Sequence, residues 1–154
     1  MVVSLMIPGL GEVSLRLILA VLLGGIIGYE RERERMAAGL RTHMLVSLGS
    51  TLAVLVGVTL FADGDGAARI AQGIITGIGF LGAGTIFFGG DRVHGLTTAA
   101  SIWIVALIGM AIGFGFYMGA LITTVLGTTL LLLRDDFFFK NKSVVSTAKM
   151  AKRK

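Results

Sequence analysis

The hydrophobic positions of this sequence fall into five long apolar stretches separated by short polar segments. In chain order the stretches cover residues 15–29, 44–62, 70–88, 96–113 and 116–133. An α-helix needs about 17 to 25 mostly apolar residues to cross the hydrocarbon core of a bilayer. We therefore predict an all-α fold, a polytopic transmembrane helix bundle of five spans over residues 15–133.

Two places leave the number of spans open. The first stretch is short unless Val13 and Ser14 join it, and Arg16 would then lie near a membrane surface that its long side chain can reach. Only Phe114 and Gly115 separate the fourth stretch from the fifth. These two stretches predict a tight helical hairpin or, as the alternative, one bent re-entrant unit that would reduce the count to four spans.

The amino-acid composition is that of a membrane protein rather than a soluble one. Of 154 residues, 55% are hydrophobic and 15% are charged, and the mean hydropathy is +0.88. Twenty-three glycines and one proline lie in a chain without cysteine, which excludes disulfides, thiol nucleophiles and Cys-ligated metals. A soluble globular domain and a collagen-like chain are also excluded.

The basic residues predict the orientation, because Lys and Arg accumulate in cytoplasmic loops. Twelve of the 14 fall in the loop after the first stretch, the loop around Asp91 and the tail. We expect residues 1–14 to be an external N-terminal segment and residues 134–154 a basic cytoplasmic tail. Residues 1–14 contain no Lys or Arg, so they lack the basic region of a signal peptide and we expect them to be retained.

The net charge of +5 is concentrated in the tail and the first cytoplasmic loop. No nucleic-acid motif accompanies it, so we expect anionic lipid at the cytoplasmic face as the partner and no nucleic acid. The alternative is a solvated tail without a specific role.

Residues 30–35 alternate Glu and Arg at the end of the first apolar stretch. Glu30 directly follows the apolar residues and is expected to be partly desolvated. Arg41 and Thr42 stand just before the second stretch. We predict that Glu30 and Arg41 pair across the first two helices and close the cytoplasmic end of the bundle; the alternative is that each is solvated independently.

Many glycines repeat at four-residue spacing within the apolar stretches. The sequence around Gly77 and Gly82 is glycine-rich, but no GK[ST] follows and no strand precedes it, so a phosphate loop is not expected. Small residues spaced by four let membrane helices approach closely. We predict tight packing within the bundle, with a homodimer as the alternative, at Gly24, Gly28, Gly73, Gly77, Gly82, Gly84, Gly109 and Gly113.

Residues that could perform chemistry are few. His43 and His94 are predicted on one side of the membrane near Asp91 and Glu30, but their spacing is not that of a metal motif, and ordinary loop histidines are favoured. Thr97 or Thr98 is predicted to cap the fourth helix. No nucleophile, base and oxyanion donor occur together, so we expect no enzyme and no cofactor, and the identity of any metal stays open.

Four ordered motifs resemble the N-terminal membrane domain of the MgtC/SapB family. They are residues 28–32, Gly39-Leu40-Arg41-Thr42-His43, the glycine-rich residues 77–84, and residues 92–103, beginning Arg92-Val93-His94-Gly95-Leu96-Thr97-Thr98. The resemblance implies functional roles at the matching positions Glu30, Arg41, Thr42, Asp91, Arg92, Thr97 and Thr98. Many family members also contain an ACT-like cytoplasmic domain, and we expect no regulation through such a domain from residues 134–154.

What the resemblance implies is a multi-pass protein of the bacterial inner membrane, linked to Mg²⁺ homeostasis and to virulence. In that family the activity is regulatory and includes inhibition of the F-type ATP synthase. We expect a regulator that acts through contacts with other membrane proteins. The alternative function is a transporter or channel for Mg²⁺ or another ion, using glycine-exposed carbonyls and Gln72.

Overall fold

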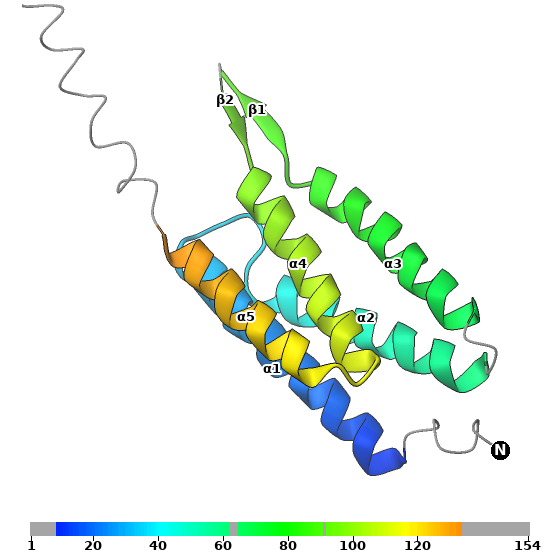
Figure 1. Ribbon diagram of the computed structural model, residues 1–154. Coiled ribbons are helices and arrows are strands. Elements are labelled where there is room, and N and C mark those ends of the chain that lie inside the picture. Colours follow the sequence, from blue (N-terminus) through cyan, green and yellow to red (C-terminus); the bar gives the residue numbers. More distant parts are fainter. Residues whose placement is uncertain (1–8, 62–64, 91, 134–154) are drawn as a thin grey trace, which may run out of the picture.

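The computed structural model describes residues 9–61, 65–90 and 92–133. Within them the chain forms five α-helices and one short β-hairpin (Figure 1). The elements are α1 (Leu10–Arg33), α2 (Leu40–Leu60), α3 (Asp65–Ala83), β1 (Phe87–Gly89), β2 (Arg92–His94), α4 (Leu96–Gly113) and α5 (Tyr117–Leu132). The prediction of an all-α membrane bundle is confirmed. Residues 1–8, Asp91 and the tail, residues 134–154, lie outside the described residues. The structure contains no membrane, so the predicted orientation of the chain stays a prediction.

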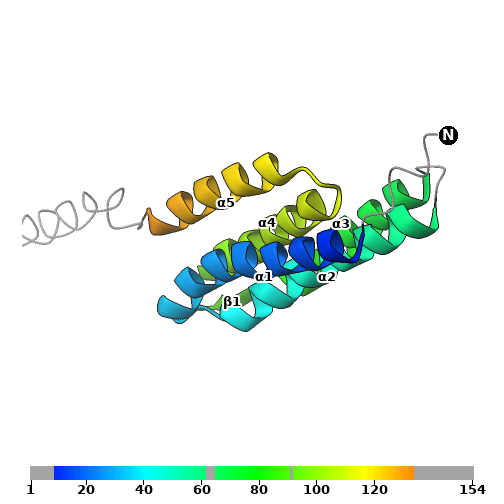
Figure 2. The same cartoon turned by 90° about the horizontal axis from the view of Figure 1, so that it is seen from below.

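Helices α1, α2 and α4 form the centre of the bundle, while α3 and α5 lie on opposite flanks (Figures 1 and 2). Of the described helices, these same three are long and apolar enough to cross a membrane. The main cluster of buried apolar side chains joins Ile27 of α1 to Val105, Ile108 and Ile112 of α4. Helices suit this environment because each satisfies its own backbone hydrogen bonds in lipid.

Several predicted boundaries differ from the observed ones. The first helix begins five residues before the predicted Leu15, at Leu10, and the second begins at Leu40, so Arg41, Thr42 and His43 are helical. Hydropathy alone placed the starts too late because amphipathic first turns carry polar residues. The predicted end of the second stretch, Ala62, lies outside the described residues.

The third predicted stretch was wrong at its C-terminal end. Helix α3 ends at Ala83, and Phe87 and Phe88 belong to β1, which pairs antiparallel with β2. The hydroxyl of Thr85 donates to the carbonyl oxygen of Gly82 at 2.8 Å, which satisfies one of the free carbonyls at the helix end. Short apolar runs do not distinguish helix from strand, so the hydrophobic pattern did not show the hairpin.

Candidate functional site

Polar side chains are buried where α1 ends, α2 and α4 begin, and α5 ends. We call this the hairpin end of the bundle, because β1 and β2 connect α3 to α4 there. Glu30 and Arg31, in the last turns of α1, are only 6% and 3% exposed. Their burial in an apolar bundle requires each charge to be neutralised by a partner.

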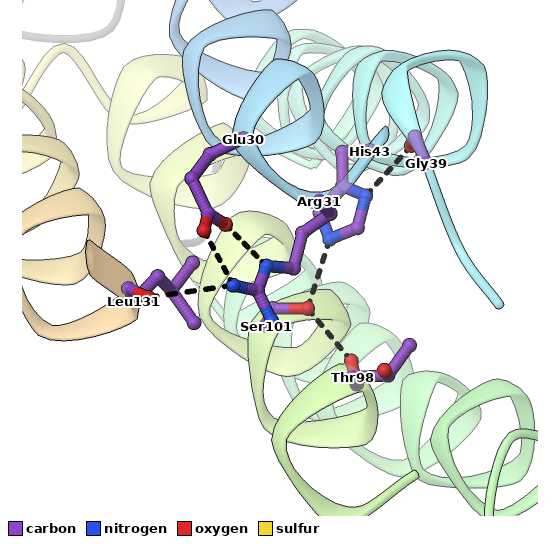
Figure 3. Close-up of polar contacts among 7 residues, drawn as sticks. All are labelled: Glu30, Arg31, Gly39, His43, Thr98, Ser101 and Leu131. Carbon is purple, nitrogen blue, oxygen red and sulfur yellow. Dashed lines mark hydrogen bonds and ion pairs between the residues drawn. The ribbon is translucent and has the colours of Figure 1, made fainter. Parts of the chain in front are cut away.

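Glu30 and Arg31 neutralise each other in a bidentate ion pair (Figure 3). Arg31 Nη2 donates to Glu30 Oε1 at 2.7 Å, and Arg31 Nε donates to Glu30 Oε2. The same Nη2 lies 3.5 Å from the carbonyl oxygen of Leu131. The pair therefore connects the end of α1 to the end of α5.

The predicted pairing of Glu30 with Arg41 is wrong. Both carboxylate oxygens of Glu30 contact Arg31, while Arg41 and Thr42 are exposed in the first turn of α2. Arg31 is one of the alternating Glu and Arg residues 30–35, and the sequence predicted no individual partner for it. Its position directly beside Glu30 at the membrane boundary was the signal that could have identified it.

His43 forms a second buried polar connection, between α2 and α4. The ring is fully buried; Nδ1 lies 2.8 Å from the carbonyl oxygen of Gly39, and Nε2 lies 3.0 Å from Ser101 Oγ. A carbonyl can only accept, so in the neutral ring Nδ1 holds the proton and Nε2 accepts from the Ser101 hydroxyl. Ser101 Oγ also donates to the carbonyl oxygen of Thr98 at 2.8 Å, so its single proton is shared between that carbonyl and His43 Nε2 (Figure 3).

The predictions for the two histidines need correction in different ways. His43 is a buried helical residue rather than a loop histidine, because α2 begins before it. His94 is exposed in β2, where its ring stacks on Phe87 with the ring centres 5.4 Å apart. Residues 9–61, 65–90 and 92–133 contain no group of three or more His, Asp or Glu side chains placed to hold a metal.

The predicted caps of α4 are also wrong. The N-cap residue is Gly95, with φ of 87°, and no side chain caps the helix. A Cβ at Gly95 would lie 1.8 Å from the carbonyl oxygen of Thr85, so both the backbone angle and the space require glycine. Thr97 is exposed in the first turn, and Thr98 is 3% exposed.

A cavity of about 780 Å³ opens at the hairpin end between α1, β2, α4 and α5. Its wall includes Glu30, Arg31, Thr97 and Thr98, so three of the predicted functional residues and the overlooked Arg31 meet there. Arg41, Thr42 and Arg92 lie outside its wall, and Asp91 is not among the described residues. Charged side chains, hydroxyls and helix ends make this the most polar cavity described.

The glycines predicted for helix packing divide into two groups. A Cβ at Gly24 or Gly28 of α1 would lie 2.8 Å from α2, and at Gly109 or Gly113 of α4 within 2.6 Å of α2, so these four form tight helix crossings. Gly82 makes an ordinary contact with Ala99 of α4. The other three do not pack helices together within the described chain: Gly73 and Gly77, which have nothing within 4 Å, and Gly84, which meets only carbonyls of its own segment.

Arg16 marks the opposite end of the bundle. Its guanidinium donates to the carbonyl oxygen of Gly113 at 2.5 Å and to the Tyr117 hydroxyl at 2.9 Å, and it pairs with Glu12. Instead of only reaching the membrane surface, it satisfies a free carbonyl at the end of α4. Sequence alone gave no reason to connect Arg16 with residues nearly 100 positions away.

The fold and the buried polar cluster define a helical membrane protein. The chain belongs to the MgtC family, whose model matches residues 17–138. It is 47% identical over 113 residues to YhiD of Escherichia coli K12, whose name describes it as a candidate magnesium transporter; the match covers 69% of this chain and 53% of YhiD.

Two further relatives show similar identity. SrpB of Synechococcus elongatus is 45% identical over 124 residues, covering 72% of this chain and 68% of SrpB. MgtC of Salmonella typhimurium is 46% identical over 112 residues, covering 73% of this chain and 48% of MgtC. The chain therefore spans about half the length of YhiD and MgtC. No solved structure matches it.

Proposed function

We propose that this protein is a multi-pass regulator in the bacterial inner membrane, linked to Mg²⁺ homeostasis, that acts by helix-to-helix contact with other membrane proteins. Membership of the MgtC family and the magnesium-related name of YhiD support the link to Mg²⁺. The outward face of α3 supports action by contact.

That face combines small and polar side chains. Gln72, Gly73, Thr76 and Gly77 are all exposed, and a Cβ at either glycine would meet nothing within 4 Å. Helix α3 lies on the flank of the bundle, with its inward side against α2 and α4 (Figure 1). The outward side of α3 therefore presents these small and polar residues together with the exposed ring of Phe80, which follows them at helical spacing.

Such a face is poorly matched to lipid tails. Glycines leave a shallow groove that an acyl chain fills loosely, and the Gln72 amide finds no hydrogen-bond partner in hydrocarbon. A transmembrane helix of another protein would fill the groove with small-to-small backbone contact and could hydrogen-bond the amide. We therefore assign the α3 face, defined by Gln72, Gly73, Thr76 and Gly77, as the partner contact.

Site-directed photo-crosslinking in bacterial cells grown at limiting Mg²⁺ tests this function. A photoreactive side chain at Gly77 should give an adduct with a different membrane protein, because the partner helix lies against that residue. The matched control is the same side chain at Leu121, an exposed position on α5. Adding Gln72→Leu to the Gly77 probe should weaken the adduct by removing the amide.

Two outcomes would contradict this function. An adduct composed only of two copies of this chain would make the α3 face a homodimer contact. Saturable Mg²⁺ flux by the purified protein in proteoliposomes would favour the alternative, an ion transporter, for which the polar cavity at the hairpin end would be the entrance.

A further inference from the structure

An apolar groove of about 510 Å³ runs along the outer side of α1 between α2 and α5. Its wall includes Leu22, Gly25 and Ile26 of α1, Met44 of α2 and Thr128 of α5, and it ends at Glu30 and Arg33. From Val21 to Arg33 the groove follows α1 for about 18 Å at the rise of an α-helix. One leaflet contributes about 15 Å of hydrocarbon, so the groove has the length of an acyl chain in that leaflet.

The groove adjoins the polar cavity at the hairpin end. Glu30, Arg33 and Leu132 belong to the walls of both. An apolar groove beside a polar cavity of about 780 Å³ fits a molecule with one long apolar part and one polar head. This adjacency of an apolar groove and a polar cavity distinguishes the α1–α5 side from the α3 face.

The wall of the polar cavity includes the Glu34 carboxylate and two donors that have no acceptor within the described residues. Arg31 Nε and Nη2 are engaged, but Nη1 has no partner among the described residues, and neither does Thr98 Oγ1. Both residues are 3% exposed and both line the cavity, from the facing helices α1 and α4 (Figure 3). These two atoms are not fully buried, so both donors are open to a ligand with acceptor oxygens in the cavity.

The start of α4 faces the same cavity and adds to this preference. The first backbone N–H groups of a helix lack intrahelical acceptors, and no side chain caps α4. Its N-terminus therefore presents free donors and the positive end of the helix dipole beside Thr97 and Thr98. Free donors, a guanidinium nitrogen and a helix N-terminus together favour a phosphate group.

Thr128 supplies a donor between the cavity and the apolar groove. Its Oγ1 is buried without a partner, whereas Thr124 and Thr129 of the same helix donate to Ala120 and Val125 carbonyls at 2.8 Å. Thr128 lies four residues, about 6 Å along the helix, before Leu132 at the cavity wall. From the middle of α1 toward the hairpin end, the apolar groove comes first, the Thr128 hydroxyl second and the polar cavity last.

We propose that this site binds one phospholipid. The acyl chain lies in the α1–α5 groove, an ester carbonyl accepts from Thr128 Oγ1, and the phosphodiester lies in the cavity against Arg31 Nη1, Thr98 Oγ1 and the start of α4. The order of apolar, ester and phosphate groups in a phospholipid matches the order of the surfaces. This site does not depend on the partner contact assigned to α3.

Native mass spectrometry of the full chain in mild detergent, titrated with phosphatidylglycerol, tests the site. One lipid should bind per chain with saturation. Thr98→Val and Thr128→Val should each weaken binding by roughly three- to tenfold, the effect of one lost hydrogen bond. Gly25→Leu should weaken it more than tenfold by filling the groove; the first added carbon fits, because its nearest neighbour is 3.6 Å away.

Thr129→Val is the matched control, because Thr129 is exposed and lies outside both cavity walls. Circular dichroism of every variant verifies that the helices remain folded. Equal lipid binding by the Thr128→Val and Thr129→Val variants, together with native binding by Gly25→Leu, would overturn the proposal. Inorganic phosphate that displaces the lipid while Gly25→Leu leaves lipid affinity unchanged would also overturn it, since the polar cavity alone would then bind a free anion.

Discussion

Two pairs of glycines with identical spacing occupy opposite environments in this protein. Gly109 and Gly113 of α4 face α2, where a Cβ would lie 2.3 Å from the Ser47 carbonyl oxygen and 2.6 Å from Val54. Gly73 and Gly77 of α3 are exposed, and a Cβ at either would meet nothing within 4 Å, although Gly77 lines an open groove between α2 and α3. The four-residue spacing shows that another helix can approach these glycines closely. Whether a helix of the same chain does so depends on where each pair lies in the bundle.

The difference follows from where each helix lies. Helix α4 contacts every other described helix, and most of its side chains are buried, whereas α3 is a flanking helix with few buried residues. At the α4 crossing, glycine is needed because backbone atoms of α2 occupy the space of a side chain. On α3, glycine leaves a surface open for another molecule.

Gly109→Ala should have the largest effect among the changes that test this comparison. The new methyl group would overlap the Ser47 backbone, which cannot move without separating α2 from α4. We expect a loss of about 3 kcal/mol in the free energy of unfolding, measured by titration with denaturing detergent in mixed micelles. Gly49→Ala on α2, where nothing lies within 4 Å, is the control and should lose no stability, with the same small gain in helix propensity as Gly73→Ala.

An unchanged free energy of unfolding in Gly109→Ala would contradict the proposed difference between the glycines of α4 and α3. It would show that α2 and α4 can move apart enough to accept the methyl group without a loss of stability. The two glycine pairs would then differ in exposure but not in their steric importance.

Ser101→Ala should have a moderate effect at the same α2–α4 interface. It removes the hydroxyl that His43 Nε2 contacts at 3.0 Å and leaves a buried ring nitrogen without its partner. Interhelical hydrogen bonds in membrane proteins contribute about 1 kcal/mol, and we expect a loss of that size in the same unfolding assay.

Ser14→Ala provides the reference for Ser101→Ala, because the exposed Ser14 hydroxyl donates only to its own helix, at Leu10. Equal losses for the two serine variants would show that the His43–Ser101 contact does not stabilise the α2–α4 interface, which the glycine contacts and the Thr51 Oγ1 to Gly109 carbonyl hydrogen bond would then hold. A larger loss for Ser101→Ala would sharpen the comparison by adding a polar connection that α3 lacks.

Gly73→Ala should have the smallest effect and the opposite sign. A methyl group there meets no neighbour, and alanine loses less conformational freedom than glycine on forming a helix. The free energy of unfolding should rise by up to about 1 kcal/mol, measured on the isolated protein. A loss of stability instead would mean that the α3 face is already packed in the isolated protein, as in a homodimer.

Hydropathy predicted the helices well because the bilayer requires long apolar segments with internally satisfied backbones. The five apolar stretches correspond to α1 through α5, but Arg92, Val93 and His94, predicted in a loop before the fourth helix, form strand β2. The β-hairpin was missed because Phe87 and Phe88 are as apolar as the helix before them. Arg31 and His43 were passed over because the sequence does not show which side of a helix faces the bundle.

By itself the sequence determined the helical class, the approximate position of each helix and the family. It also determined where glycines permit close contact, because side-chain size is a local property. Only the tertiary structure decided that Arg31 rather than Arg41 neutralises Glu30, that His43 reaches Ser101, and that the glycines of α4 are covered while those of α3 are open. These outcomes depend on which helix lies against which, and that choice depends on packing between residues far apart in the chain.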